Sequence, residues 1–236
     1  MWSEWMLAFP IVLLAAMIQT STGFGFAIIA IPLFILLYPT HYAILLSVFL
    51  SLISSLTTLP RVVKDIDKLL LKRLLIGSLF GLPLGGLLYY TADVAWLKLI
   101  VGFAIILSAL SIMIKIRFPL GDGKRIGFLS GFLTSSIGVP GPPIIFYLMS
   151  KNMDKNIFRG TSMAYYCVVY PASLAILLSI GRFHTDLLLD LLLIPAIFIG
   201  QAFGSVLHKR INQTAFRRLT FILLVATGIN SVIQSF

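Results

Sequence analysis

Two short stretches of hydroxyl-bearing residues and glycines interrupt long runs of uncharged sequence. The first covers residues 19–25 and reads Gln-Thr-Ser-Thr-Gly-Phe-Gly; the second covers residues 134–143 and reads Thr-Ser-Ser-Ile-Gly-Val-Pro-Gly-Pro-Pro. Hydroxyl and amide groups donate hydrogen bonds, and the free N–H groups at the start of a helix attract anions. Both stretches therefore have the residue types of a binding site for a small anion.

The candidate substrate-binding residues come from both stretches. They are Gln19, Thr20, Ser21, Thr22, Gly23, Gly25, Thr134, Ser135, Ser136, Gly138, Gly141 and Pro142. Together they would form a cage of hydroxyl, amide and backbone N–H groups without a fixed cation. An alternative stays open, in which the Ser and Thr side chains only cap the ends of interrupted helices.

The composition excludes a water-soluble globular domain. Of the 236 residues, 59% are apolar and 11% are charged, with a mean hydropathy of +1.03, whereas soluble domains carry about 25% charged residues. The formal charge of +10 comes from basic residues that lie between the apolar runs. We therefore expect the chain to lie in a lipid bilayer and not to bind nucleic acid.

The lengths of the apolar runs predict an all-α polytopic membrane protein with about eight hydrophobic segments. A helix needs about 20 apolar residues to cross roughly 30 Å of hydrocarbon. Single spans are predicted over residues 41–60, 74–92, 95–114, 160–181, 191–207 and 217–235. The two remaining segments, residues 5–38 and 126–150, contain the polar stretches and are predicted to be broken helices. Glycines interrupt both of them, and the second stretch also contains three prolines.

The distribution of basic residues favours re-entrant hairpins for both broken segments. If all eight segments cross the membrane, ten Lys and Arg residues lie on one side and eight on the other; if the broken segments turn back, the division is 16 against 2. Cytoplasmic loops collect Lys and Arg, so we expect hairpins and both termini on the outer side. A discontinuous span over residues 126–150 stays open. No basic residue precedes the first apolar run, which we expect to be retained rather than cleaved as a signal peptide.

A weak internal repeat divides the chain into residues 1–118 and 119–236. The first polar stretch matches the second at an offset of 114, and Gly81 and Gly85 recur 119 residues later as Gly200 and Gly204. One hairpin plus three spans per half would insert the halves in opposite directions, as in the inverted repeats of many secondary transporters. For the glycines we expect close helix packing rather than a ligand role.

Other polar residues give weaker signals. Thr161, Tyr165, Gln201 and Asn230 are secondary candidates for the site, although hydrogen bonding between helices is the default interpretation for such side chains. The three histidines lie near segment ends and Cys167 is the single cysteine, so we expect no metal site and no cofactor. The sequence contains no G-x-x-x-x-G-K-[ST], G-x-S-x-G or H-E-x-x-H motif, which argues against ATP use and against an enzyme.

The two polar stretches, together with Arg159-Gly160-Thr161-Ser162, resemble motifs of the sulfite exporter TauE/SafE family. The resemblance extends over nearly the whole chain. The resemblance implies a multi-pass inner-membrane permease for sulfur oxyanions, organosulfonates or related organic anions, with the two stretches along the substrate path. We therefore expect a secondary transporter, an exporter, that works by alternating access with its site at the facing broken helices. An anion channel and an intramembrane hydrolase are the alternatives. The transported anion, the direction, the coupling ion and homo-oligomerisation stay open.

Overall fold

The computed structural model describes residues 2–93, 96, 99, 103, 122–151, 153–179, 190–210, 212 and 222, and every regular element among them is helical. The α-helices are α1 (Trp2–Thr22), α2 (Phe26–Phe34), α3 (Thr40–Val62), α4 (Lys68–Thr91), α6 (Gly123–Ile137), α7 (Gly141–Ser150), α8 (Lys155–Ser179) and α10 (Ile194–Arg210). Two 3-10 turns, η1 (Val63–Asp65) and η2 (Leu191–Leu193), extend α3 and precede α10.

Within the described residues, five helices are long and apolar enough to cross a membrane. They are α1, α3 with η1, α4, α8, and α10 with η2. The all-helical, multi-pass fold is therefore confirmed. The predicted spans 95–114 and 217–235 fall, apart from isolated positions, outside the described residues, so the eight-segment count stays a prediction.

Both polar stretches interrupt a helix, as the sequence predicts. Between α1 and α2, Gly23 and Gly25 have φ angles of 89° and 103°, and between α6 and α7, Gly138 has a φ angle of 74°. Side chains other than glycine rarely adopt this left-handed backbone, so these positions end the helices. Pro142 and its neighbour then occupy the first turn of α7, where a missing N–H costs no helical hydrogen bond.

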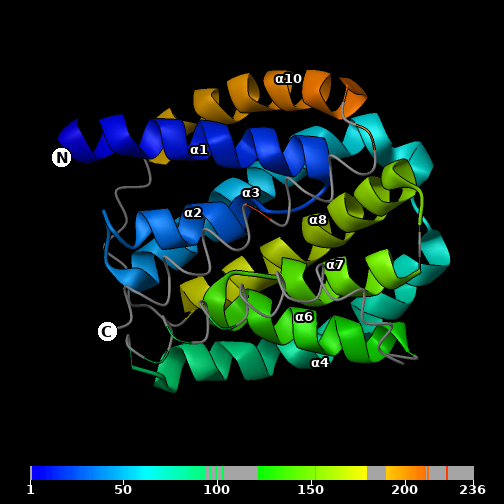
Figure 1. Ribbon diagram of the computed structural model, residues 1–236. Helices are drawn as coiled ribbons and strands as arrows, with labels where there is room; N and C mark the ends of the chain where they lie inside the picture. Colours follow the sequence, from blue (N-terminus) through cyan, green and yellow to red (C-terminus); the bar gives the residue numbers. More distant parts are fainter. Residues whose placement is uncertain are drawn as a thin grey trace.

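The two broken segments are antiparallel helix pairs that open toward opposite ends of the molecule. In Figure 1, α1 and α2 run in opposite directions and are joined toward the right, whereas α6 and α7 are joined toward the left. The α3–α4 connection, the starts of α6 and α8, and the end of α10 all lie toward the right-hand end. Sixteen of the 18 Lys and Arg residues form four basic clusters, at residues 61–73, 115–125, 151–159 and 209–218. The described members of all four clusters lie in these places. How these pairs lie in a bilayer stays a prediction.

Glycines allow the close packing of two helix pairs, which confirms their expected structural role. A Cβ atom at Gly81 would collide with the carbonyl oxygen of Phe128, so α4 and α6 touch through their backbones. A Cβ atom at Gly200 would collide in the same way with the carbonyl oxygen of Leu13, on α1. The first arm of each hairpin thus packs on the glycine-bearing helix of the other half. The inverted repeat itself stays a prediction, because the fourth segment of each half lies outside the described part of the chain.

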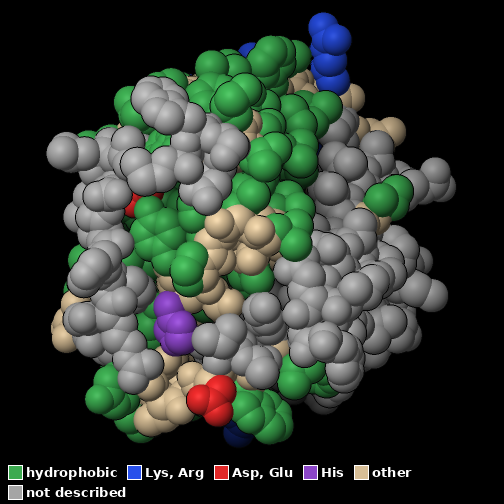
Figure 2. Space-filling view, turned by 90° about the vertical axis from the view of Figure 1, so that its left-hand side faces the viewer, with side chains coloured by type: hydrophobic (Ala, Val, Ile, Leu, Met, Phe, Trp, Pro, Cys, Tyr) green, Lys and Arg blue, Asp and Glu red, His purple; other side chains and the backbone are tan. Residues whose placement is uncertain are grey.

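The short helix α2 lies inside the protein rather than against lipid. Eight of its nine residues are buried, and they belong to two apolar clusters, one with α3, α4, α6, α7 and α8 and the other with α1, α3 and α10. Most of the described surface in Figure 2 is hydrophobic, as expected where a protein faces lipid. The first break therefore lies inside the helix bundle, where backbone groups without a helical partner can bind a ligand.

Candidate functional site

The first break leaves the start of α2 without a side-chain cap. Gly25 is the N-cap residue and has no side chain, and the first helical hydrogen bond runs from the N–H of Ile29 to the carbonyl of Gly25. The N–H groups of the three intervening residues therefore precede the helical ladder. The start of α2 presents a partial positive charge of about half a unit. The start of α2 points toward the right-hand end of Figure 1, where the basic clusters lie and which we call the basic end.

A buried arginine lies directly against this break. Arg159, in the first turns of α8, is only 7% exposed. A Cβ atom built on Gly23 would lie 2.8 Å from the Cα of Arg159, 3.2 Å from its Cβ and 3.3 Å from its Cγ. Only glycine at position 23 allows this approach. The aliphatic part of the Arg159 side chain therefore packs on Gly23, which brings a basic residue next to a break where the sequence predicts a cage without a fixed cation.

The charges around Arg159 do not neutralise it. Its Nε atom has no hydrogen-bond partner, and no acidic side chain among the described residues forms an ion pair with it. Arg61 and Asp65 are close enough for their charges to act on it in opposite senses. Ser162, three residues further along α8 and fully buried, has a hydroxyl oxygen without a partner. Arg159 and the N-terminus of α2 thus lie beside the same break, and these two groups both favour an anion.

His208 connects the end of α1 to α8 and α10. Its Nδ1 donates to the carbonyl oxygen of Ser21, with the two atoms 2.8 Å apart, and its Nε2 lies 3.1 Å from Oδ1 of Asn156. The Ser21 carbonyl belongs to the last turn of α1, where helical carbonyls lack partners. His208 therefore fixes the position of the break relative to Arg159, which is on the same helix as Asn156.

The other predicted residues of the first stretch are all buried, but most of their hydroxyls bond to backbone. Ser21 and Thr22 donate to the carbonyl oxygen of Ile18, as expected for capping. Gln19 donates from Nε2 to the Ser55 hydroxyl at 3.1 Å, while its Oε1 and the Thr20 hydroxyl have no partner.

The second break has a different environment from the first. A Cβ atom at Gly138 would meet the apolar side chains of Ile31, Val48 and Ile44. One at Gly141 would meet Ile28 and Ile145 and would lie 3.8 Å from the hydroxyl of Tyr166, which has no hydrogen-bond partner. No charged group among these contacts matches Arg159.

The hydroxyls of the second stretch bond to carbonyls. Thr134 donates to Ser130, Ser135 to Leu82 and Ser136 to Phe132. In α7, Pro142 and the proline after it lack N–H groups, so this helix start offers fewer donors than that of α2. The contacts at the second break thus include side chains of α2 but no charged group, and substrate binding by the second stretch stays a prediction.

The secondary candidates connect helices. Thr161 accepts from the N–H of Asp67 at 3.0 Å, whereas the buried Tyr165 hydroxyl has no hydrogen-bond partner. Gln201 donates from Nε2 to the Thr57 hydroxyl at 2.6 Å and to the Ser54 carbonyl oxygen at 3.0 Å. Asn230 lies outside the described residues.

A stripe of hydroxyls along α3 was missed in the sequence. Its members, all fully buried, are Ser47, Ser51, Ser54, Ser55 and Thr58. Their spacing places them on one side of the helix, over a rise of about 16 Å, or about half the hydrocarbon thickness. The stripe contacts α1 through Gln19 and α10 through Gln201, and the hydroxyls of Ser47 and Thr58 have no partner. It forms a polar track through the interior that reaches the end of α3 nearest the basic loops.

These groups can donate hydrogen bonds to a small anion. Among the residues that the structure describes, no three His, Cys, Asp or Glu side chains lie together as a metal site would require. His208, beside the break, uses its Nδ1 in a hydrogen bond to the carbonyl oxygen of Ser21.

Comparison with known proteins gives one match. The model of the family described as sulfite exporter TauE/SafE matches residues 8–231, which is nearly the whole chain. No curated protein and no solved structure matches it. The family is one of membrane transporters of sulfur anions. The chain, with its interrupted helices inside a multi-pass bundle, therefore belongs to the sulfite exporter TauE/SafE family.

Proposed function

We propose that the protein is a secondary transporter that exports a small anion, such as sulfite, an organosulfonate or a related organic anion, by alternating access. The observation that supports this most directly is the buried, unpaired Nε of Arg159 beside the break between α1 and α2. Burying a charge without a partner is costly. An anion bound there would offset this cost, and the family membership makes a sulfur anion the first candidate.

The types of donor at the first break suit an oxyanion of a few atoms. A guanidinium group can donate two parallel hydrogen bonds to two oxygens of one oxyanion, and the N–H groups at the start of α2 can donate to a third oxygen. The unpaired hydroxyl of Ser162 is one turn away from Arg159 on α8. Sulfite and sulfonates each present three oxygens on one sulfur, which matches this arrangement of donors.

Two observations support alternating access. The reciprocal glycine packing of α1 on α10 and of α6 on α4 is what an inverted repeat would produce. The second break is closed by apolar side chains from α2 and α3, including Ile31 and Val48. An anion at Arg159 would thus have a polar environment toward the basic end and an apolar barrier toward the other end. Rocking of one half against the other would move that barrier.

We further propose that the protein resides in the inner membrane with its basic end in the cytoplasm and both termini outside. The described basic residues of all four clusters lie toward one end (Figure 1), which fits the preference of cytoplasmic loops for Lys and Arg. An exporter in this orientation would load its anion from the side on which Arg159 lies.

The test is flux through proteoliposomes that contain the purified protein. Vesicles loaded with sulfite should release it in a saturable manner, and external sulfite or methanesulfonate should accelerate the release more than acetate does. Gly25→Ala should slow the flux, because alanine is strained at a φ of 103°, whereas Leu84→Ala, on an exposed side chain, should not. A conductance far above carrier rates would favour an anion channel, and flux of acetate alone would refute the sulfur-anion assignment.

A further inference from the structure

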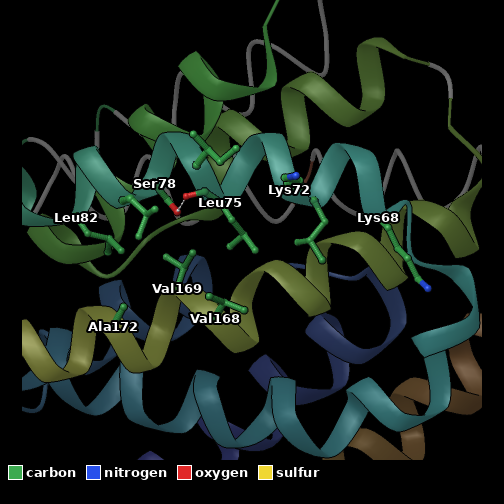
Figure 3. A pocket seen from close by; sticks show the side chains of 11 residues that line it. Lys68, Lys72, Leu75, Ser78, Leu82, Val168, Val169 and Ala172 are labelled. Atoms are coloured by element: carbon green, nitrogen blue, oxygen red, sulfur yellow. Dashed lines mark hydrogen bonds between the residues drawn. The ribbon is translucent and has the colours of Figure 1, made fainter.

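An apolar groove runs along the outside of the bundle between α4 and α8. It has a volume of about 310 Å³. Its walls include Leu75, Leu79 and Leu82 from α4 and Val168 and Ala172 from α8. We call it the α4–α8 groove. Figure 3 shows Leu82 and Ala172 at one end and Lys68 at the other.

The groove exists because the facing side chains of α8 are short. Val168 and Ala172 face the longer leucines of α4, so the two helices do not close against each other as α4 and α6 do. Val168 is 50% exposed and Leu79 is 67% exposed. Side chains that line an empty groove lack dispersion contacts on one side. A flexible apolar chain from the surrounding lipid would supply these contacts and would be stabilised in the groove.

The length of the groove corresponds to one leaflet of a bilayer. From Lys68 to Leu82, α4 rises about 21 Å at 1.5 Å per residue. Half of a hydrocarbon core of roughly 30 Å is about 15 Å, which leaves the first turn of α4 at headgroup depth. A lipid acyl chain lying beside the leucines would therefore bring its headgroup to the start of α4.

Two lysines mark that end of the groove. Lys68 and Lys72 are exposed, are one helical turn apart and line the groove. Neither forms an ion pair with an acidic side chain within the described ranges. The nearest acidic residue in sequence, Asp67, uses its carboxylate to accept the N–H of Leu70 and cap α4. The end of the groove therefore has positive charge available for a phosphate.

We propose that the α4–α8 groove is a binding site for one anionic phospholipid of the leaflet on the basic side, with an acyl chain along the leucines of α4 and the phosphate at Lys68 and Lys72. The site is separate from Arg159 and does not depend on the identity of the transported anion. A zwitterionic lipid would fill the groove equally well, but its headgroup would gain less from the two lysines.

The proposal can be tested by native mass spectrometry of the full chain in detergent, titrated with phosphatidylglycerol or phosphatidylcholine. We expect one phosphatidylglycerol to remain bound at concentrations where phosphatidylcholine does not. The double variant Lys68→Gln, Lys72→Gln should bind phosphatidylglycerol roughly thirtyfold more weakly, equivalent to about 2 kcal/mol, as expected for two lysines near an anionic headgroup. The control Lys209→Gln, Arg210→Gln removes two exposed charges from α10 and should leave binding unchanged.

A second variant fills the groove without changing charge. Val168→Trp should abolish the retained phosphatidylglycerol while the protein stays monodisperse, because half of the Val168 side chain is already exposed. This variant decides the question if the lysine variant does not fold. Equal binding of the two lipids by the unmodified protein, or undiminished phosphatidylglycerol binding by Val168→Trp, would overturn the proposal. So would a dimer that Val168→Trp dissociates, since a second copy would then occupy the groove.

Discussion

Replacement of Arg159 by glutamine should weaken anion binding strongly while leaving the fold in place. Glutamine retains the Cβ and Cγ atoms that Arg159 packs against Gly23. What it loses is the charge and the unpaired Nε. The change therefore separates the electrostatic role of this side chain from its packing role at the first break.

The expected magnitude follows from the burial of the guanidinium group. Arg159 is 7% exposed, so solvent screens its interaction with a bound anion little. A hydrogen bond to a charged group contributes about 1.5–3 kcal/mol, and each 1.4 kcal/mol is a tenfold change in the dissociation constant. Arg159→Gln should thus raise the dissociation constant for sulfite roughly 10- to 150-fold. Arg159→Lys keeps the charge but loses the planar fork and should give an intermediate value.

Isothermal titration of the detergent-solubilised protein with sulfite, and separately with methanesulfonate, measures this effect. The matched control is Arg61→Gln, which makes the same substitution at an exposed position whose charge also acts on Arg159. Salt screens exposed charges, so the control should stay within about threefold of the unmodified protein. The reasoning is wrong if Arg159→Gln binds sulfite within threefold of the unmodified protein while its thermal unfolding is unchanged.

Three further changes test other features of the molecule. Gly81→Val should lower the thermal stability by about 1–3 kcal/mol or prevent folding, because its side chain would enter the backbone contact between α4 and α6; unchanged unfolding temperature would contradict that contact. Ser162→Ala should weaken sulfite binding about three- to tenfold, as for one hydrogen bond of 0.5–1.5 kcal/mol, and equal affinities in a titration would remove this hydroxyl from the site. In a Cys167→Ala background, a membrane-impermeant maleimide should label Lys151→Cys only from the cytoplasm and Asp93→Cys only from outside. Lys151 follows α7 and Asp93 follows α4, and these two helices end at opposite ends of the molecule (Figure 1); labelling from the same side would refute the orientation.

The interruptions of both broken helices could be predicted from the sequence because backbone chemistry determines them locally. Gly23, Gly25 and Gly138 adopt left-handed conformations that few other residues tolerate. The spacing of Gly81 and Gly85 likewise predicted close helix packing, and the structure confirms it. Each of these inferences depends on residue type and short spacing alone.

The charged part of the site could not be predicted in this way. Arg159 lies near the start of a hydrophobic segment, where a basic residue normally belongs to a cytoplasmic loop. Only the fold shows that Gly23 removes the side chain that would otherwise exclude it. The hydroxyl stripe on α3, from Ser47 to Thr58, has a helical period that the sequence does contain. It was missed because the composition of the whole segment is apolar, and only the period of its small polar residues marks one side of the helix.

The charges at the first break also determine how easily the transporter should reorient when its binding site is empty. Without an anion, the guanidinium group of Arg159 and the start of α2 are both positive and have no acidic partner in an ion pair among the described residues. A conformational change that moved them across the apolar barrier at Ile31 and Val48 would desolvate these charges further. With an anion bound, the same movement would transfer a nearly neutral unit and would meet a lower barrier. Exchange of one anion for another should therefore be faster than net release, because only net release requires the empty site to reorient.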